Sequence, residues 1–283
     1  MSKRIYTWKD NKALELGKKT LVMGILNVTP DSFSDGGKWN TIDGAISHMI
    51  EMVEAGADII DIGAESSRPG FEAMTADEEI KRLSVFLEPV LAACPVPVSI
   101  DTFKAKTAEF AAARGVHLLN DIWGLQYAQE PGKMARVAAK YNLPVIVTHN
   151  RTSNEYDGDI IESMREFFAK SIAIAQEAGL TKDRIILDPG IGFGKTTGGN
   201  LYVMQQLDKL KEINGQEYPM LLGTSRKSFI GNTLNLPVEE RMEATGATCV
   251  IGILKGCEIL RVHDVKPISR MCRITDAILE AKQ

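Results

Sequence analysis

Three side chains at the ends of short apolar runs have the chemistry needed to bind a flat nitrogen heterocycle. They are Asp101, Asn120 and Asp188. A buried carboxylate must find hydrogen-bond donors, because desolvating it without a partner costs several kcal/mol. The edge of an amino-pyrimidinone ring offers adjacent N–H donors that a carboxylate accepts in a bidentate manner. Any one of these residues alone is commonly structural, but three that converge predict a ligand pocket.

Cationic side chains form a second group, which favours an anion such as diphosphate. Arg68 lies in ESSRPG, Lys227 in TSRKS, and Arg261 and His263 lie in RVHDV. Barrel enzymes often bind phosphate at the loops after strands seven and eight, where three of these residues fall. Arg151 is interpreted instead as a solvated surface charge.

The glycine-rich segment DPGIGFGKTTGGN does not match either of two common nucleotide-binding loops. The GxxxxGK[ST] pattern needs glycine where Pro189 stands, and GxGxxG needs glycine where Lys195 stands. Glycines directly after Asp188 would let the backbone approach a ligand held by that carboxylate, although turn chemistry explains the glycines about as well.

These clusters need a fold that brings them together. Eight apolar runs, each as long as a strand buried on both faces, end in such polar clusters. Helix-like segments lie between them: Ile46, Met49, Ile50 and Val53 form one apolar stripe before Gly56. Further helices are expected over residues 76–92, 104–114, 133–141, 160–178, 201–213, 238–255 and 268–281.

The alternation of strands and helices predicts an α/β fold, a (β/α)8 TIM barrel, rather than an open doubly wound sheet. In such a barrel the residues just past each strand's C-terminal end meet on one face. Residues 20–283 are assigned to the barrel. Residues 1–19 are expected to form a short β-hairpin, with its turn at Asp10-Asn11, that covers the barrel floor.

Composition limits the class of protein. The net charge is −4 and charges of both signs are mixed, so no nucleic-acid partner is expected. No apolar stretch is suited to spanning a bilayer or to a signal peptide, and no membrane association is expected. The four cysteines lack CxxC spacing, which favours reduced packing residues in a cytoplasmic protein.

Seven motifs, in sequence order, resemble those of the dihydropteroate synthases. They are MGILNVTPDSFSDGG, ESSRPG, SIDT, NDI, DPGIGFGK, GTSRKS and RVHDV. The resemblance extends from about Leu21 to the C-terminus and implies a folate-pathway transferase on a (β/α)8 barrel. Such an enzyme joins 4-aminobenzoate to 6-hydroxymethyl-7,8-dihydropterin diphosphate, and releases diphosphate and 7,8-dihydropteroate.

The resemblance also implies a role for each matching residue. The pterin would be bound by Asp101, Asn120, Asp188 and Lys227. The diphosphate would be bound by Asn27, through a Mg²⁺ ion that it holds, and by Ser67, Arg68, Arg261 and His263. The 4-aminobenzoate site would be lined by Phe33, Pro69, Phe193 and Ser228. The residues acting in catalysis would be Arg68, Asp101, Arg261 and His263.

The expected chemistry is a displacement at the pterin methylene. Mg²⁺ with arginine and histidine supplies positive charge where the diphosphate develops negative charge. The aromatic amine attacks directly, so no nucleophilic residue is required. We expect a dissociative, SN1-like step in which Asp101 favours a cationic methylene, and a covalent pterin adduct on the protein is the competing possibility.

Three positions depart from the usual pattern of the family. Ala64 stands in place of a glycine, Ser67 in place of threonine, and Thr148 in place of methionine. Ser67 keeps the hydroxyl, whereas Thr148 loses an apolar side chain that could pack on the pterin. His149 either faces the ligand or supports residues that do. The TPDSFSDGG and ESSRPG segments are either lids or ordinary loops.

Two rival functions stay open from the sequence. One is a pterin-binding methyltransferase of the corrinoid type, which handles no diphosphate. The other is a non-catalytic paralogue that binds pterins for another purpose. The family resemblance further suggests small-molecule substrates and a homodimer formed through helices remote from the barrel mouth.

Overall fold

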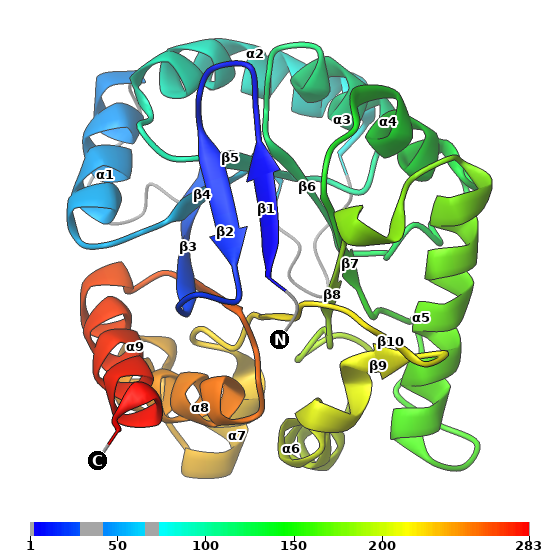
Figure 1. Ribbon diagram of the computed structural model, residues 1–283, viewed down its shortest axis with the longest axis vertical. Helices are drawn as coiled ribbons and strands as arrows, with labels where there is room; N and C mark the ends of the chain where they lie inside the picture. Colours follow the sequence, from blue (N-terminus) through cyan, green and yellow to red (C-terminus); the bar gives the residue numbers. More distant parts are fainter. Residues whose placement is uncertain (1–2, 29–41, 66–73, 283) are drawn as a thin grey trace.

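The core of the molecule is a closed barrel of parallel strands (Figure 1). The computed structural model describes residues 3–28, 42–65 and 74–282. Its main sheet has eight strands in the spatial order β11-β12-β3-β4-β5-β6-β7-β8. A bridge between Leu187 and Met220 joins the two ends of this order and closes the barrel. The (β/α)8 prediction is therefore confirmed.

The barrel strands are short, and two small hairpins lie outside the barrel sheet. The barrel strands are β3 (Leu21–Asn27), β4 (Ile59–Gly63), β5 (Val98–Asp101), β6 (Leu118–Asp121), β7 (Val145–Thr148), β8 (Ile185–Asp188), β11 (Leu221–Leu222) and β12 (Ile259–Val262). The hairpins are β1 (Arg4–Thr7) with β2 (Ala13–Leu16), and β9 (Glu212–Ile213) with β10 (Gln216–Glu217).

Helices surround the barrel on its outer side, as Figure 1 shows. Within the described ranges they are α1 (Ile42–Glu54), α2 (Ala76–Ala93), α3 (Ala105–Ala112), α4 (Lys133–Tyr141), α5 (Ile160–Glu177), α6 (Thr197–Gln205), α7 (Ser228–Leu234), α8 (Met242–Leu254) and α9 (Val265–Glu280). Thr75 and Glu78 form a capping box at the start of α2. None of the helices in these ranges is long and apolar enough to cross a membrane.

The helix predicted over residues 201–213 has the wrong bounds, and only a short 3-10 turn at Leu207–Leu210 follows the observed helix before the next hairpin. The observed helix, α6, starts at Thr197 and ends at Gln205, and the β9–β10 hairpin follows it. Asn214 and Gly215 form the hairpin turn, with φ angles of 51° and 75°. An Asn-Gly pair adopts positive φ readily at both positions, so local turn chemistry overrides the apolar periodicity here. The seven-residue helix α7 was not predicted, because it is too short to show a helical period.

Side chains that face the barrel axis form layers of different chemistry. The lowest layer is apolar and contains Leu21, Met23, Ile59, Leu118, Ile146, Ile186, Leu221 and Ile259. Successive side chains of a strand point to opposite faces, so the residue two positions further along faces the axis again. At that level the interior becomes polar, with Asp61, Asn120, Thr148, Asp188 and Arg261. The polar residues therefore stand directly on an apolar base.

The N-terminal hairpin covers the barrel floor, as predicted. Its side chains Tyr6, Leu14 and Leu16 join the lowest apolar layer, and Figure 1 shows the hairpin lying across the barrel. The buried ring of His117 accepts a hydrogen bond at Nδ1 from a backbone N–H, so its proton lies on Nε2. Nε2 lies 2.9 Å from Asp10 Oδ2, and this bond ties the hairpin turn to the barrel.

Tyr6 tests whether the hairpin packs as a true barrel floor. Tyr6→Ala should lower the free energy of unfolding by about 3–5 kcal/mol, because a large buried side chain leaves a cavity. Tyr6→Phe should cost only about 0.5–1.5 kcal/mol, since it removes a single hydrogen bond from Oη to the Asp183 carbonyl.

Ile5→Ala is the matched control in urea denaturation. Ile5 is on the opposite face of the same strand and its side chain is 57% exposed. Its replacement should change stability by less than about 0.5 kcal/mol. Equal losses for Ile5→Ala and Tyr6→Ala would show that the hairpin does not stabilise the barrel.

Candidate functional site

A network of buried charges occupies the C-terminal end of the barrel. The Arg261 guanidinium donates from Nε to Asp61 Oδ2 and from Nη2 to Asp101 Oδ2, both at 2.6 Å. The Asn120 amide donates from Nδ2 to the same Asp61 oxygen at 3.0 Å. These four side chains come from β12, β4, β5 and β6. The fold thus joins Asp101, Asn120 and Arg261, as predicted, through an aspartate that was not predicted.

Asp188 is held at the end of β8 by its neighbours. Its side chain is buried, and Oδ1 accepts a hydrogen bond from the Gly190 N–H at 2.8 Å. Thr148 Oγ1 donates to Oδ2 over a longer distance of 3.4 Å. A carboxylate can accept several more hydrogen bonds than these, so Asp188 keeps capacity for a ligand that presents N–H groups.

Lys227 lies just before α7, near the loop that follows Asp188. Its Nζ donates to the Ile191 carbonyl and lies 4.7 Å from the centre of the Phe193 ring. Gly192 allows this approach, because a methyl carbon at that position would lie 3.1 Å from the lysine Cδ. The lysine therefore packs over the glycine-rich loop that carries the predicted ligand contacts.

Burial and mutual interaction shift the pKa values of these groups. Burial raises the pKa of Asp101 to about 7, which Arg261 opposes and the Asp61 charge reinforces. Burial lowers the pKa of Lys227 to about 8, against the attraction of Asp188. Burial also raises the pKa of Asp188, and the charges of Lys227 and Arg261 oppose that change. Acids and cations from distant parts of the sequence therefore lie close enough at this end of the barrel to act on one another.

His263 and Asn27 lie at two further strand ends. The Ser225 hydroxyl accepts from the His263 backbone N–H at 3.1 Å and lies 2.9 Å from Nδ1 of its ring. If the hydroxyl donates to Nδ1, the ring proton lies on Nε2.

Asn27 is exposed, and a methyl carbon at Gly63 would lie 3.5 Å from Asn27 Oδ1 and 3.8 Å from Asp101 Oδ2. Gly63 therefore leaves space between these two oxygens.

Four predicted site residues lie outside the described residues: Phe33, Ser67, Arg68 and Pro69. The two remaining residues assigned to 4-aminobenzoate are both described. Phe193 is half-buried, and Ser228 is exposed as the first residue of α7.

A buried ionic network holds the residues that flank the range 66–73. Glu65 Oε1 accepts from the Met74 N–H at 2.8 Å, which brings the two flanks together. Lys104 Nζ pairs with Glu65 and lies 3.3 Å from Glu79 Oε2. Thr107 Oγ1 donates to the same Glu79 oxygen at 2.8 Å. Both flanks are thereby fixed near the end of β5.

His149 is buried and supports the loop after Asp188. Its Nδ1 lies 2.9 Å from Lys195 Nζ, and its backbone N–H donates to the Asp188 carbonyl at 2.9 Å. Lys195 Nζ also donates to the carbonyls of Gly190 and Phe193, at 2.9 and 3.0 Å. Burial lowers the pKa of Lys195 to about 7. Of the two roles considered for His149, this geometry favours the supporting one.

Sequence reasoning missed Asp61 and Lys195 as parts of the site. The signal for Asp61 was an acid between the isoleucines of the run IIDIG, since a buried acid needs partners. Lys195 appeared only as a mismatch to a glycine pattern. No local signal shows that its ammonium group turns back into the loop.

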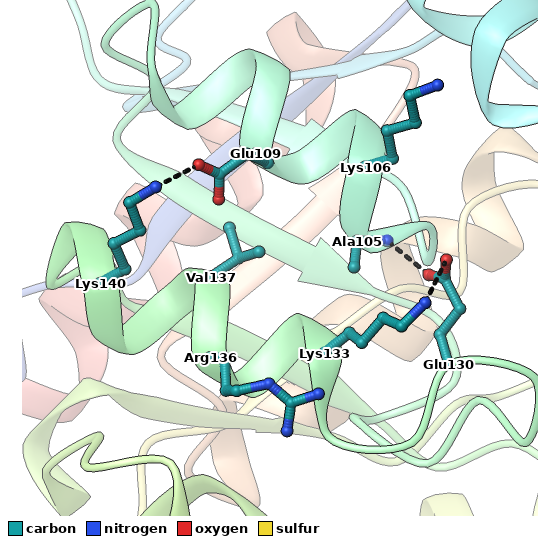
Figure 2. A pocket seen from close by; sticks show the side chains of 8 residues that line it. All are labelled: Ala105, Lys106, Glu109, Glu130, Lys133, Arg136, Val137 and Lys140. Carbon is teal, nitrogen blue, oxygen red and sulfur yellow. Dashed lines mark hydrogen bonds and ion pairs between the residues drawn. The ribbon is translucent and has the colours of Figure 1, made fainter.

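A separate hollow of about 330 Å³ lies between α3 and α4 (Figure 2). It is lined by Ala105, Lys106, Glu109, Glu130, Lys133, Arg136, Val137 and Lys140. Most of its charges are already matched, as with Lys140 and Glu109 at 2.6 Å and Lys133 and Glu130 at 3.8 Å. Among the described residues, no group of three or more histidine, cysteine or acidic side chains is suited to a metal ion. We therefore place the candidate site at the barrel mouth.

Comparison with known proteins shows which family this chain resembles. The family model described as "Pterin binding enzyme" matches residues 23–263. The dihydropteroate synthase of Clostridium beijerinckii is 52% identical over 270 residues, which cover 95% of this chain and 98% of that protein.

Solved structures show the same similarity. A crystal structure of dihydropteroate synthase from Clostridium difficile, determined in the presence of pteroic acid, has a TM-score of 0.88 at 47% identity and covers 94% of this chain and 99% of that chain. The Xanthomonas albilineans dihydropteroate synthase with 4-aminobenzoic acid has a TM-score of 0.88 at 35% identity, with 96% and 97% covered. The identity extends over nearly the whole chain, so this protein belongs to the dihydropteroate synthase family of pterin-binding enzymes.

Proposed function

We infer that the protein joins 6-hydroxymethyl-7,8-dihydropterin diphosphate to 4-aminobenzoate, forming 7,8-dihydropteroate and diphosphate. Relatives whose structures contain pteroic acid and 4-aminobenzoic acid support both substrate classes. The observation that carries the inference is the cluster of Asp101, Asp188, Lys227 and Arg261 at the C-terminal ends of the barrel strands, where Arg261 donates to Asp101 and the charges of Lys227 and Arg261 act on Asp188. It combines acceptors for a ring with N–H donors and cations for a diphosphate.

The pterin is assigned to Asp188, Asn120, Asp101 and Lys227. Asp188 would accept two hydrogen bonds from N–H groups of the amino-pyrimidinone edge. These bonds would replace the hydrogen bonds to water that the carboxylate loses on burial. Thr148, at a position where the family resemblance implies methionine, directs its hydroxyl to Asp188. We therefore assign Thr148 to orienting Asp188, a role that partly replaces the lost apolar contact with the pterin.

The diphosphate is assigned to Arg261 and His263, together with Ser67 and Arg68. Asn27 would hold Mg²⁺, because its exposed amide oxygen suits an ion that prefers oxygen ligands and keeps water and phosphate oxygens around it. When bound, the ion would neutralise charge on the leaving diphosphate. Chelation with EDTA should stop turnover and added Mg²⁺ should restore it; turnover that survives chelation would contradict this assignment.

The reaction needs no covalent bond to the protein. The bond between the pterin methylene carbon and the diphosphate oxygen breaks, and its electron pair leaves with the diphosphate. The amine nitrogen of 4-aminobenzoate forms the new C–N bond and loses a proton to water. We propose that bond breaking leads in an SN1-like step, because the Asp101 carboxylate would stabilise a cationic methylene. A pterin adduct on the protein, detected by mass spectrometry, would contradict this proposal.

The 4-aminobenzoate site is assigned to Phe193 and Ser228, with Phe33 and Pro69 completing it. Phe193 offers an apolar ring next to Lys227, whose Nζ lies 4.7 Å from the ring centre. Sulfonamides have a similar aromatic amine and should compete at this site. They should raise the KM for 4-aminobenzoate and leave kcat unchanged.

We propose that the protein is a homodimer formed through α8 and α9. These helices pack side by side (Figure 1) and expose the apolar side chains Ile251, Leu254, Ile274, Ile278 and Leu279. Large apolar side chains that stay exposed on two adjacent helices are typical of a protein–protein interface. Sedimentation should give twice the 31.1 kDa chain mass, and Ile278→Lys should give a monomer. A monomeric wild-type protein would end this proposal.

A cytoplasmic location stays a prediction. It is supported by the cysteines, since Cys94, Cys249, Cys257 and Cys272 are all buried and free, as expected of a reducing compartment. Cell fractionation would test it.

The two rival functions leave parts of the site unexplained. A methyltransferase of the corrinoid type handles no diphosphate and would have no use for Arg261 and His263 as anion-binding groups. A non-catalytic paralogue would bind the pterin without turnover. Diphosphate release distinguishes both rivals from the proposed reaction.

Asp188 provides the direct test of the proposed reaction. Wild-type protein should release diphosphate when both substrates are present. Asp188→Ala should lose at least about 1.5–3 kcal/mol of pterin binding, because the ring N–H groups would be left without acceptors. Isothermal titration calorimetry measures the binding, with Asp183→Ala as a control at an aspartate whose side chain is 57% exposed. Unchanged pterin binding by Asp188→Ala would show that the pocket is wrongly assigned.

The shifted pKa values predict how activity depends on pH. Asp101 must be ionised to stabilise positive charge, so kcat/KM should fall about tenfold per pH unit below its pKa of about 7. Lys227 must be protonated to bind an anion or a ring acceptor, so kcat/KM should also fall above its pKa of about 8. Asp101→Asn should remove the acid limb and keep the basic one. An acid limb that persists unchanged in Asp101→Asn would show that another group controls it.

A further inference from the structure

Asp61 links two ligand-facing residues from below the barrel mouth. Its side chain is fully buried, and a single oxygen, Oδ2, accepts from Asn120 Nδ2 at 3.0 Å and from Arg261 Nε at 2.6 Å. Its strand, β4, is not hydrogen-bonded to β6 or to β12, which lie two places away on either side in the sheet order. Asp61 therefore connects these strands through the barrel interior.

We propose that Asp61 is a positioning residue that fixes the orientation of the Asn120 amide and of the Arg261 guanidinium, and so sets which ring edges the pterin pocket accepts. This inference rests on the proposed function, because it takes the pterin as the ligand. It assigns to Asp61 an action through its two neighbours and no contact with substrate.

The Asn120 amide can satisfy Asp61 in only one orientation. Asp61 Oδ2 acts as an acceptor toward the Arg261 guanidinium, so the donor end of the amide, its nitrogen, must face the same oxygen. A flipped amide would place its oxygen against Asp61 Oδ2, in a buried setting where that contact is strongly unfavourable. The amide oxygen of Asn120 is therefore kept for the ligand.

This orientation limits the ligand chemistry. Asp188 is an acceptor, and with Asn120 held in this way the pocket offers a second fixed acceptor on a different strand. A ring that binds well must present N–H donors to both residues. A reduced pterin carries such donors on both of its fused rings, whereas a ring with acceptors on one edge would leave a buried oxygen unpaired.

Arg261 is restrained by the same carboxylate. Asp61 holds Nε and Asp101 holds Nη2, so two contacts define the plane of the guanidinium. Nη1 has no hydrogen bond to any of the described residues and remains a donor for an anionic ligand. Without Asp61 the guanidinium could rotate about its single contact with Asp101.

The unused oxygen of Asp61 provides a conservative variant. Among the described residues, Oδ1 has no hydrogen-bond partner although it is buried. In Asp61→Asn the amide oxygen can occupy the Oδ2 position and accept both bonds, and the NH₂ group can occupy the Oδ1 position without displacing a contact. Asp61→Leu has a similar size but accepts neither bond. The pair of variants separates the hydrogen bonds from the space that the side chain fills.

Binding of the pterin diphosphate, measured by calorimetry, tests the proposal. Asp61→Leu should raise the Kd by roughly 10-fold or more, about the effect of losing one oriented hydrogen bond to a buried group. Asp61→Asn should recover most of this loss. The KM for the pterin substrate should rise far more than the KM for 4-aminobenzoate.

A double-mutant cycle shows whether Asp61 acts through Asn120. In an Asn120→Ala background, Asp61→Leu should cost much less than in the wild type, because the amide that it orients is gone. Ser99→Ala is the matched control: Ser99 pairs with Asp61 in the strand register, is fully buried, and its hydroxyl has no partner among the described residues. Its Kd should match that of the wild type.

Each outcome decides between positioning and a purely structural role. The proposal is overturned if Asp61→Leu binds the pterin as the wild type does, or loses the same factor in both backgrounds. If Asp61→Leu does not fold, the side-chain amide of Asn120 in ¹⁵N-labelled wild-type protein gives the answer. One of its two protons should exchange slowly with solvent, and equal fast exchange of both would overturn the proposal. A wild-type protein that binds no pterin would instead overturn the proposed function.

Discussion

The guanidinium of Arg261, held between two carboxylates, is the interaction on which the site depends. Burial opposes its charged form, but Asp61 and Asp101 keep the pKa of Arg261 above its ordinary value. An unpaired charge at this depth would be strongly destabilising. Two acids around one cation leave a net negative charge, which is one reason why the pKa of Asp101 is raised. Arg261 and Asp101 can therefore act side by side: the guanidinium offers an N–H donor to an anion, and the carboxylate stabilises a developing cation.

The barrel makes this charge cluster possible by separating two environments along its axis. Apolar side chains from the strands and the N-terminal hairpin fill the lower interior and exclude water. Polar side chains begin two residues later on the same strands, at the level where the parallel strands end. Charged groups are thus packed on a rigid apolar base on one side and open to substrates on the other.

Buried lysines fix the loops that surround the mouth. Lys195 donates to two carbonyls of the loop after Asp188, and its Nζ lies 2.9 Å from His149 Nδ1. Lys104 pairs with Glu65 and Glu79 beside the end of β5. Each ammonium group crosslinks segments that are otherwise joined only through the barrel. Restraint of this kind lowers the entropy that is lost when a substrate binds between the loops.

The sequence by itself determined most of the elements, the eightfold alternation and the strand ends that carry Asp101, Asn120, Asp188 and Arg261. These features follow from local periodicity and from the polar residues that end each apolar run, and both are written in neighbouring residues. Boundaries set by turn chemistry, as at Asn214-Gly215, were only partly predictable. Tertiary structure alone decided the partners of the buried charges. Asp61 pairs with Asn120 and Arg261, which lie 59 and 200 positions away from it in the sequence. No local sequence pattern encodes which donors the closed barrel brings to its carboxylate.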